Sequence, residues 1–180
     1  MTSDSVEHSP RSTGDAPVIR IAVFDIDGVL ADVRHRLHHV ERSPKNWDGF
    51  FAEMVDDAPL EAGIAMVHDQ VAAGCDIAYL TGRNESYRDV TAAWLTNQGL
   101  PTGRLVMRRD MDRRPAKLYK PEALTRLARH GSIEIIVDDD VVVVDVLRGN
   151  GWPVLHASWM GADKAEQQSL FDTQEVDGRN

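Results

Sequence analysis

An apolar stretch that ends in two closely spaced acids narrows the possible folds of this chain more than any other feature. Residues 18–24 are apolar except for Arg20, as expected of a parallel strand covered on both faces. Asp25 and Asp27 follow, at the end of the strand where open α/β sheets bind ligands. Such close carboxylates repel each other unless a cation or a proton lies between them, so the stretch predicts a Mg²⁺ site. A simple turn with Asp27-Gly28 at its corner is the alternative.

The composition limits the class of protein. The chain has 180 residues, 42% of them hydrophobic and 27% charged, which fits one domain with a sizeable core. Its net charge of −9 argues against a protein that coats duplex nucleic acid, since that task needs a positive field. The single Cys75 permits no internal disulfide, and we interpret it as a buried, reduced thiol. With no secretory signal and no membrane-spanning apolar stretch, we expect a cytoplasmic location.

The two ends of the chain differ in composition from the middle. Residues 1–17 predict a disordered tail, and residues 163–180 predict a loosely ordered polar tail. Residues 18–162 predict one α/β domain with a parallel sheet and helices on both faces. Within it, residues 33–58 show the spacing of two short helices, inserted after the first strand. This insert is too small to be a separate cap domain.

Three histidines, at positions 35, 38 and 39, lie in this insert. Histidine clusters can bind transition metals, but no set of cysteines or carboxylates accompanies these three in the sequence. We therefore expect them to face solvent or substrate, and we assign no second metal.

The second predicted strand, residues 76–80, ends in Thr81-Gly82-Arg83. A hydroxyl and a glycine at a strand-to-helix turn suit a phosphate, because the hydroxyl and the following amides can donate hydrogen bonds. Arg83 is a candidate to bind a substrate phosphate through bidentate hydrogen bonds. The alternative is that it forms a surface ion pair on the next helix. The pattern is weak alone and gains weight from its place at a strand end.

Basic residues crowd the stretch that follows the predicted third strand, residues 104–108. They are Arg108, Arg109, Arg113, Arg114, Lys117 and Lys120. Most charge runs are solvated faces. Lys120 precedes Pro121, and because proline fits the first turn of a helix, we expect Lys120 at a helix entrance, aimed at a bound phosphate. Lys117, one turn earlier, is the alternative.

The fourth predicted strand, residues 133–137, ends in Asp138, Asp139 and Asp140. We expect Asp140 to cap a helix over residues 141–149. Four strand ends thus carry, in order, Asp-x-Asp, Thr, Lys and Asp-Asp. A receiver domain would carry its phosphorylated Asp on the third strand, and the glycine patterns of dinucleotide and P-loop sites do not occur here.

These four motifs resemble those of the haloacid dehalogenase (HAD) superfamily of phosphohydrolases. The resemblance implies a HAD-like, Rossmannoid parallel sheet and Mg²⁺-dependent hydrolysis of phosphomonoesters through a phospho-aspartate. It implies that Asp25 is the nucleophile and Asp27 the acid/base catalyst. By the same resemblance, Thr81 orients the phosphoryl group, Gly82 offers its N–H, and Lys120 balances the charges of nucleophile and phosphate.

The resemblance also implies the metal ligands. They are Asp25, the main-chain carbonyl of Asp27, and the acids of the fourth motif. We favour Asp139 as the inner ligand and Asp138 as the second, bound through water or paired with the lysine. Because Asp27 uses its carbonyl, its side chain is expected to be free to carry protons.

Within the superfamily, residues 21–156 are most similar to the 3′-phosphatase domain of phage polynucleotide kinase. They share Phe-Asp-Ile-Asp-Gly, the Gly-Arg pair, the basic loop and an Asp-Asp followed by a Val-rich helix. A functional arginine of that domain stands eleven residues after the nucleophile, as Arg36 does here. An acid of its basic loop has no match, since Ala116 and Lys117 stand near its place. The resemblance implies a polynucleotide 3′-phosphatase of nucleic-acid end repair, in which Arg36, Arg83 and the arginine-rich loop bind the nucleic-acid end. A separate kinase or ligase is a candidate partner.

Two other functions fit the same motifs. A 5′(3′)-nucleotidase or small-metabolite phosphatase would close the helical insert over its substrate. In that case Trp47, Phe50 and Phe51 would line the site instead of packing inward. The other alternative is a non-catalytic partner module for a kinase or ligase. It is disfavoured because every acid that the chemistry needs is present.

Overall fold

The computed structural model describes residues 18–160, except residue 42. The two predicted tails, and residues 161 and 162 of the predicted domain, lie outside the described residues. In the part of the chain that is described, no helix has the length and apolar character needed to cross a membrane.

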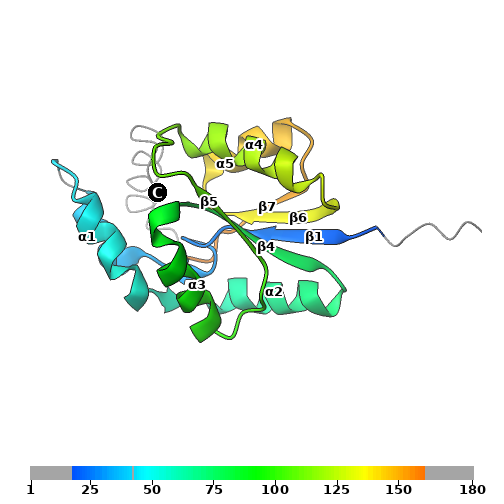
Figure 1. Cartoon of the computed structure of the whole chain (residues 1–180), viewed down its shortest axis with the longest axis horizontal. Helices are drawn as coiled ribbons and strands as arrows, with labels where there is room; N and C mark the ends of the chain where they lie inside the picture. Colours follow the sequence, from blue (N-terminus) through cyan, green and yellow to red (C-terminus); the bar gives the residue numbers. More distant parts are fainter. Residues whose placement is uncertain (1–17, 42, 161–180) are drawn as a thin grey trace, which may run out of the picture.

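Five parallel strands form the central sheet, in the order β5-β4-β1-β6-β7 (Figure 1). They are β1 Arg20–Phe24, β4 Asp76–Asn84, β5 Arg104–Arg108, β6 Ser132–Asp138 and β7 Val154–His156. All neighbouring strands in this sheet are parallel, which confirms the predicted α/β class. Phe24 of β1 pairs with Tyr79 of β4 and Val137 of β6, so the residues that follow these three emerge at one edge of the sheet.

Helices cover both faces of the sheet (Figure 1). α2 (Glu61–Ala72) and α3 (Arg88–Asn97) cover one face, and α4 (Ala116–Leu127) and α5 (Val141–Gly149) cover the other. The sequence of β1 serves both layers, because successive side chains of a strand point to opposite faces. Ala22 and Phe24 pack with the α2–α3 core, whereas Ile21 and Val23 pack with the α4–α5 core. This two-sided burial explains the unbroken apolar run that the sequence showed.

The insert after β1 is small and helical, as predicted. It contains two 3₁₀ helices, η1 (Arg34–His39) and η2 (Glu53–Asp56), with α1 (Trp47–Ala52) between them. A two-stranded antiparallel ladder of β2 (Ala31–Asp32) and β3 (Ala58–Pro59) closes its base. The insert has its own apolar cluster, and no large cap domain is present among the described residues.

The start of α4 differs from our expectation. This helix begins at Ala116, so Lys120 and Pro121 lie inside it and not at its entrance. Proline at this position removes one helical hydrogen bond. The helix continues through it because one face is anchored by buried side chains, those of Ala116, Tyr119, Lys120, Ala123, Leu124 and Leu127.

Candidate active site

A tight turn after β1 brings the first motif to the edge of the sheet. The carbonyl of Ile26 accepts hydrogen bonds from the amides of Leu30 and Ala31, at 2.8 and 2.9 Å. Gly28 lies in this turn at φ +76°, a conformation that favours glycine. A Cβ at Gly28 would stand 1.9 Å from Oδ2 of Asp139, so any side chain here would displace that carboxylate.

We call the first group of charges the aspartate–lysine cluster, and its members are Asp25, Asp138, Asp139 and Lys120. One oxygen from each of the three carboxylates lies within 4.8 Å of the others. Nζ of Lys120 donates to Oδ2 of Asp25 at 2.5 Å and to Oδ2 of Asp138 at 2.7 Å. The lysine that contacts Asp25 is therefore Lys120, the residue we favoured over Lys117.

This cluster is buried and carries more negative than positive charge. Three carboxylates and one ammonium leave a net charge of −2 when all four groups are ionised. Burial raises the pKa of Asp25 to about 7, Lys120 opposes this shift, and the charge of Asp138 adds to it. Burial, together with the charges of Asp25 and Asp138, also raises the pKa of Asp139 well above its ordinary value. The cluster thus favours an added proton or cation.

Asp139 shows where a cation fits. Both of its carboxylate oxygens are buried, and neither has a hydrogen-bond partner in the described part of the chain. Asp138, in contrast, accepts from Lys120 and from the amide of Asp140. An all-oxygen set around an unpartnered buried carboxylate suits a hard divalent cation such as Mg²⁺. Asp140 caps α5 as predicted, accepting from the amides of Val142 and Val143.

We call the second group the arginine–aspartate cluster, and its members are Asp27, Asp57, Arg36 and Arg83. Oδ1 of Asp27 accepts from Nη2 of Arg36 at 2.7 Å and from Nη2 of Arg83 at 2.5 Å. Oδ2 of Asp57 accepts from the same two nitrogens, at 2.7 and 2.8 Å. All four side chains are almost completely buried. Two anions therefore face two cations, and this cluster is neutral.

The pairing of Asp27 corrects one expectation. Its side chain is not free, because both guanidinium groups bind it. Burial alone would raise the pKa of Asp27, but the charges of Arg83 and Arg36 outweigh it and lower the pKa to about 2. In this arrangement the carboxylate is ionised at neutral pH.

Arg36 and Arg83 lie beside the first motif, but they do not face open solvent. Both are fully buried, so the alternative of Arg83 as a surface ion pair is wrong. Their predicted contact with substrate remains a prediction. Asp57, which completes their pairing, was missed in the sequence, where it is one acid among several in the insert. No local pattern singles it out, because its partners come from η1 and from β4.

Thr81 and Gly82 also lie at this edge of the sheet, both buried. The predicted turn after residue 80 is wrong, since β4 continues to Asn84, which pairs with Arg108 of β5. The pairing with β5 is interrupted between Leu80 and Asn84, and a helical segment, η3 (Glu85–Tyr87), follows directly after Asn84. The hydroxyl of Thr81 accepts from the amide of Arg83 at 3.2 Å.

The arginines of the loop between β5 and α4 differ in whether they form ion pairs with other described residues. Arg114 forms ion pairs with Asp112 and Glu122. Arg109 and Arg113 are exposed, and neither forms an ion pair with another described residue.

The aromatic residues of the insert pack inward. Phe50 and Phe51 are buried, as is most of Trp47, and all three belong to the apolar cluster of the insert. They do not line the aspartate–lysine cluster. We expected them to line the site if the protein were a nucleotidase.

Comparison with known proteins gives one family match. The sequence model of the protein family described as polynucleotide kinase PNKP phosphatase domain matches residues 19–159. No curated protein matches the sequence.

Several solved structures share the fold. A chain of the Pnkp1/Rnl/Hen1 RNA repair complex is 22% identical over 86% of this chain, with a TM-score of 0.66. A class C acid phosphatase from Bacillus anthracis with tungstate bound is 14% identical over 87% of this chain, with a TM-score of 0.61. The match covers 80% of the acid phosphatase but only 46% of the Pnkp1/Rnl/Hen1 chain, so the present chain spans about half the length of the latter.

Proposed function

We propose a function from one premise: this chain belongs to the family of polynucleotide kinase PNKP phosphatase domains, within the HAD superfamily. As a phosphatase domain of that superfamily, it is a hydrolase of phosphoric monoesters. The specific activity that we propose is Mg²⁺-dependent removal of 3′-phosphates from DNA or RNA ends. The observation that carries it is the aspartate–lysine cluster within a domain of this family.

We assign the covalent step to Asp25. Its carboxylate oxygen attacks phosphorus in line, the bond to the ester oxygen breaks, and a phospho-aspartate forms. Water then attacks this phosphorus and releases phosphate and the free carboxylate. Lys120, 2.5 Å from Asp25, offsets negative charge as it develops on the phosphoryl oxygens. Mg²⁺ held by Asp25, Asp139 and the carbonyl of Asp27 would supply further positive charge there, with Asp138 held by the lysine.

Asp27 is proposed to give a proton to the leaving oxygen and later to take one from water. With its pKa lowered to about 2, it has to lose part of its arginine pairing before it can hold a proton. A bound substrate phosphate offers the arginines a competing anion. We therefore propose that Arg83 and Arg36 share their hydrogen bonds between Asp27 and the substrate phosphate, which raises the pKa of Asp27 only when substrate is bound. Thr81 and Gly82 complete the phosphate contacts.

Two observations favour a polymer end over a mononucleotide. Arg109 and Arg113 are exposed on the loop that leads into α4, the helix of Lys120, where they can contact phosphates next to the reacting end. The inward packing of Trp47, Phe50 and Phe51 leaves them unavailable as a cover for a small substrate. A chain of an RNA repair complex shares this fold, so we propose a separate kinase or ligase as partner in end repair. We also propose a cytoplasmic location, consistent with the free thiol of Cys75.

A substrate panel tests this function. Phosphate release is measured from 3′-phosphorylated DNA and RNA oligonucleotides, 3′-mononucleotides, 5′-phosphorylated oligonucleotides and sugar phosphates, each with Mg²⁺ and with EDTA. We expect the highest kcat/KM on 3′-phosphorylated oligonucleotides and no activity in EDTA. Asp25→Asn should lower kcat by at least about 10⁴-fold, as expected when a nucleophile is lost. Faster release from mononucleotides or sugar phosphates would favour the nucleotidase, and an inactive wild type would favour the partner module.

The loop arginines provide a second test of the substrate class. Arg109→Ala with Arg113→Ala should raise KM for oligonucleotides and reduce its salt dependence, because fewer phosphates are contacted. The KM for a 3′-mononucleotide should not change. Arg129→Ala, an exposed arginine after α4, is the matched control. Equal effects on both substrates would contradict contact with a polymer.

A further inference from the structure

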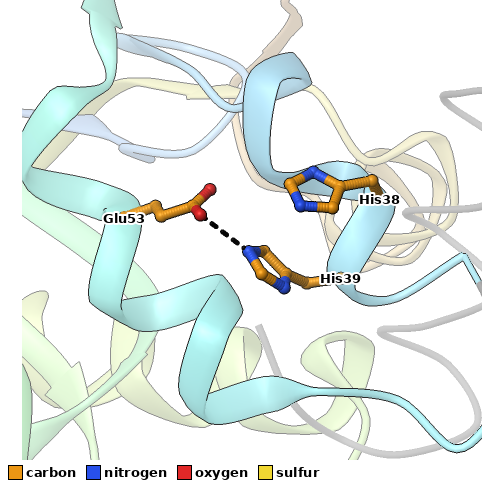
Figure 2. Close-up of side chains that lie close together, drawn as sticks. All are labelled: His38, His39 and Glu53. Carbon is orange, nitrogen blue, oxygen red and sulfur yellow. Dashed lines mark ion pairs between the residues drawn. The ribbon is translucent and has the colours of Figure 1, made fainter.

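Two histidines and a glutamate of the insert meet at its surface (Figure 2). His38 and His39 come from η1, and Glu53 is the first residue of η2. One ligand atom from each of the three lies within 4.8 Å of the others. Nε2 of His39 stands 2.9 Å from Oε1 of Glu53. The sequence had shown histidines without a carboxylate, and the fold supplies the carboxylate.

Neighbouring groups orient both rings. Nδ1 of His38 lies 3.0 Å from the carbonyl oxygen of His35. Since a carbonyl only accepts, Nδ1 carries the proton and the lone pair of Nε2 remains available, the arrangement typical of metal-binding histidines. The ring of His39 packs directly on Gly49, where a Cβ would come within 2.7 Å of it. Nδ1 of the same ring lies 3.3 Å from the carboxamide nitrogen of Asn46, the residue that caps α1. Since a carboxamide nitrogen only donates, Nδ1 of His39 accepts here, and Nε2 carries the proton that faces Glu53, which a bound ion would replace.

The spacing and exposure of the three residues suit an exchangeable metal. Ligand atoms around one tetrahedral Zn²⁺ lie roughly 3.3 Å apart, since each bond is about 2.0–2.1 Å long. The three ligand atoms lie within 4.8 Å of one another, so binding would draw them closer, and Glu53 can rotate because 40% of its side chain is exposed. His38 is exposed as well, which gives the ion access from solvent.

The donor atoms differ from those of the aspartate–lysine cluster. Two imidazole nitrogens and one carboxylate suit Zn²⁺ and similar first-row ions, whereas the all-oxygen set of Asp25, Asp138 and Asp139 suits Mg²⁺. Three protein ligands leave the fourth position for water.

We propose that His38, His39 and Glu53 form a second metal site, which binds one Zn²⁺ or a similar first-row divalent ion. The ion ties η1 to η2. These two segments also hold charges of the arginine–aspartate cluster in place, because Arg36 lies in η1 and Asp57 follows η2. The bound ion would stabilise the insert by linking two of its helices. The site does not depend on which phosphate ester the enzyme hydrolyses.

Metal titration of the untagged protein tests this site. Zn²⁺ is titrated by calorimetry in excess Mg²⁺, which occupies the aspartates, and melting temperatures are recorded with and without Zn²⁺. We expect the wild type to bind one Zn²⁺ more than the His38→Ala/His39→Ala variant, and only the wild type to gain melting temperature from it. Glu53→Gln should weaken Zn²⁺ binding by at least about 10–100-fold, the loss typical of removing even an outer-shell partner.

Two controls separate this site from other sources of zinc binding. His68→Ala removes an exposed histidine of α2 and should bind Zn²⁺ like the wild type. Asp139→Asn disables the aspartates and should also keep the additional Zn²⁺. The site would be disproved by equal Zn²⁺ binding in the wild type and the double-histidine variant. Loss of the additional Zn²⁺ in Asp139→Asn alone would likewise disprove it, by placing that ion at the aspartates.

Discussion

Asp25 and Asp27 are separated by one residue, yet they belong to clusters with opposite charge balance. The aspartate–lysine cluster has three carboxylates for one ammonium, and Asp139 in it lacks any partner among the described residues. The arginine–aspartate cluster has two carboxylates for two guanidinium groups, and its anions are paired. Accordingly the pKa of Asp25 is raised to about 7, while that of Asp27 is lowered to about 2.

The difference shows that the surroundings of a carboxylate decide its chemistry more than its place in a motif does. Burial is equal for both residues, so it cannot explain why their pKa values diverge. The number of cations within hydrogen-bonding distance explains it. The arginine–aspartate cluster is neutral as it stands, whereas the aspartate–lysine cluster keeps an excess of negative charge that a cation would offset.

The largest effect on folding stability is expected in the neutral cluster. Arg36→Met should lower the free energy of unfolding by about 3–5 kcal/mol, because Asp27 and Asp57 would stay buried after losing one of the two arginines that pair with both. Urea denaturation at neutral pH measures this. Arg34→Met is the matched control, since its exposed pair with Asp32 should contribute less than about 1 kcal/mol. Similar losses in both variants would contradict a special role for the buried pairs.

Replacing the lysine of the other cluster should affect activity most. Lys120→Met should lower kcat/KM by about 10²–10³-fold, because the ammonium group that pairs with Asp25 and Asp138 no longer offsets charge on the phosphoryl group. Steady-state phosphate release at saturating Mg²⁺ measures this. Lys117→Met should remain within about threefold of wild type. A larger loss in Lys117→Met than in Lys120→Met would reverse our assignment.

The two clusters should respond to pH in opposite directions. Asp25 keeps a proton in the folded state up to about pH 7, whereas an unfolded carboxyl loses it near pH 4, so stability in EDTA should fall as pH rises between these values. We expect a loss on the order of 4 kcal/mol. The contribution of Asp27 is complete above about pH 4, and about 2–3 kcal/mol should disappear as pH falls to about 2.

Mg²⁺ distinguishes these two effects. When Mg²⁺ binds at the aspartates, it takes the place of the proton on Asp25. Saturating Mg²⁺ should therefore abolish the fall in stability above pH 4 and leave the loss of stability below pH 4, which is due to Asp27, unchanged. Urea denaturation across pH with Mg²⁺ and with EDTA measures both limbs. An unchanged slope above pH 4 would show that Mg²⁺ binds elsewhere.

The smallest expected effect is a gain in stability in the aspartate–lysine cluster, and the matching change in the arginine–aspartate cluster has the opposite sign and a larger size. Asp139→Asn should stabilise the metal-free protein by about 1–2 kcal/mol at pH 8, because it removes repulsion among buried carboxylates. Asp57→Asn should destabilise it, since both arginines lose an anion. Thermal unfolding in EDTA compares them, with the exposed Asp145→Asn of α5 as control. Destabilisation by Asp139→Asn would mean that this carboxylate has a partner.

Sequence patterns predicted the strands and several details at their ends. The cap formed by Asp140, the reach of Lys120 to Asp25 and the inserted helices all agree with expectation. The start of α4 and the end of β4 were placed incorrectly. In both cases tertiary contacts overrode local signals: side-chain burial carries α4 through Pro121, and pairing with β5 extends β4.

The sequence by itself determined that acids, a hydroxyl and a lysine accompany the strands of one parallel sheet. Apolar runs place these strands in the interior, and the shared direction of the strands brings their ends to one edge. Only the tertiary structure decided which charge meets which. Lys120 is 95 residues from Asp25, and Arg83 is 56 residues from Asp27. Pairing over such separations depends on how the sheet, the helices and the insert pack, and no local pattern records it.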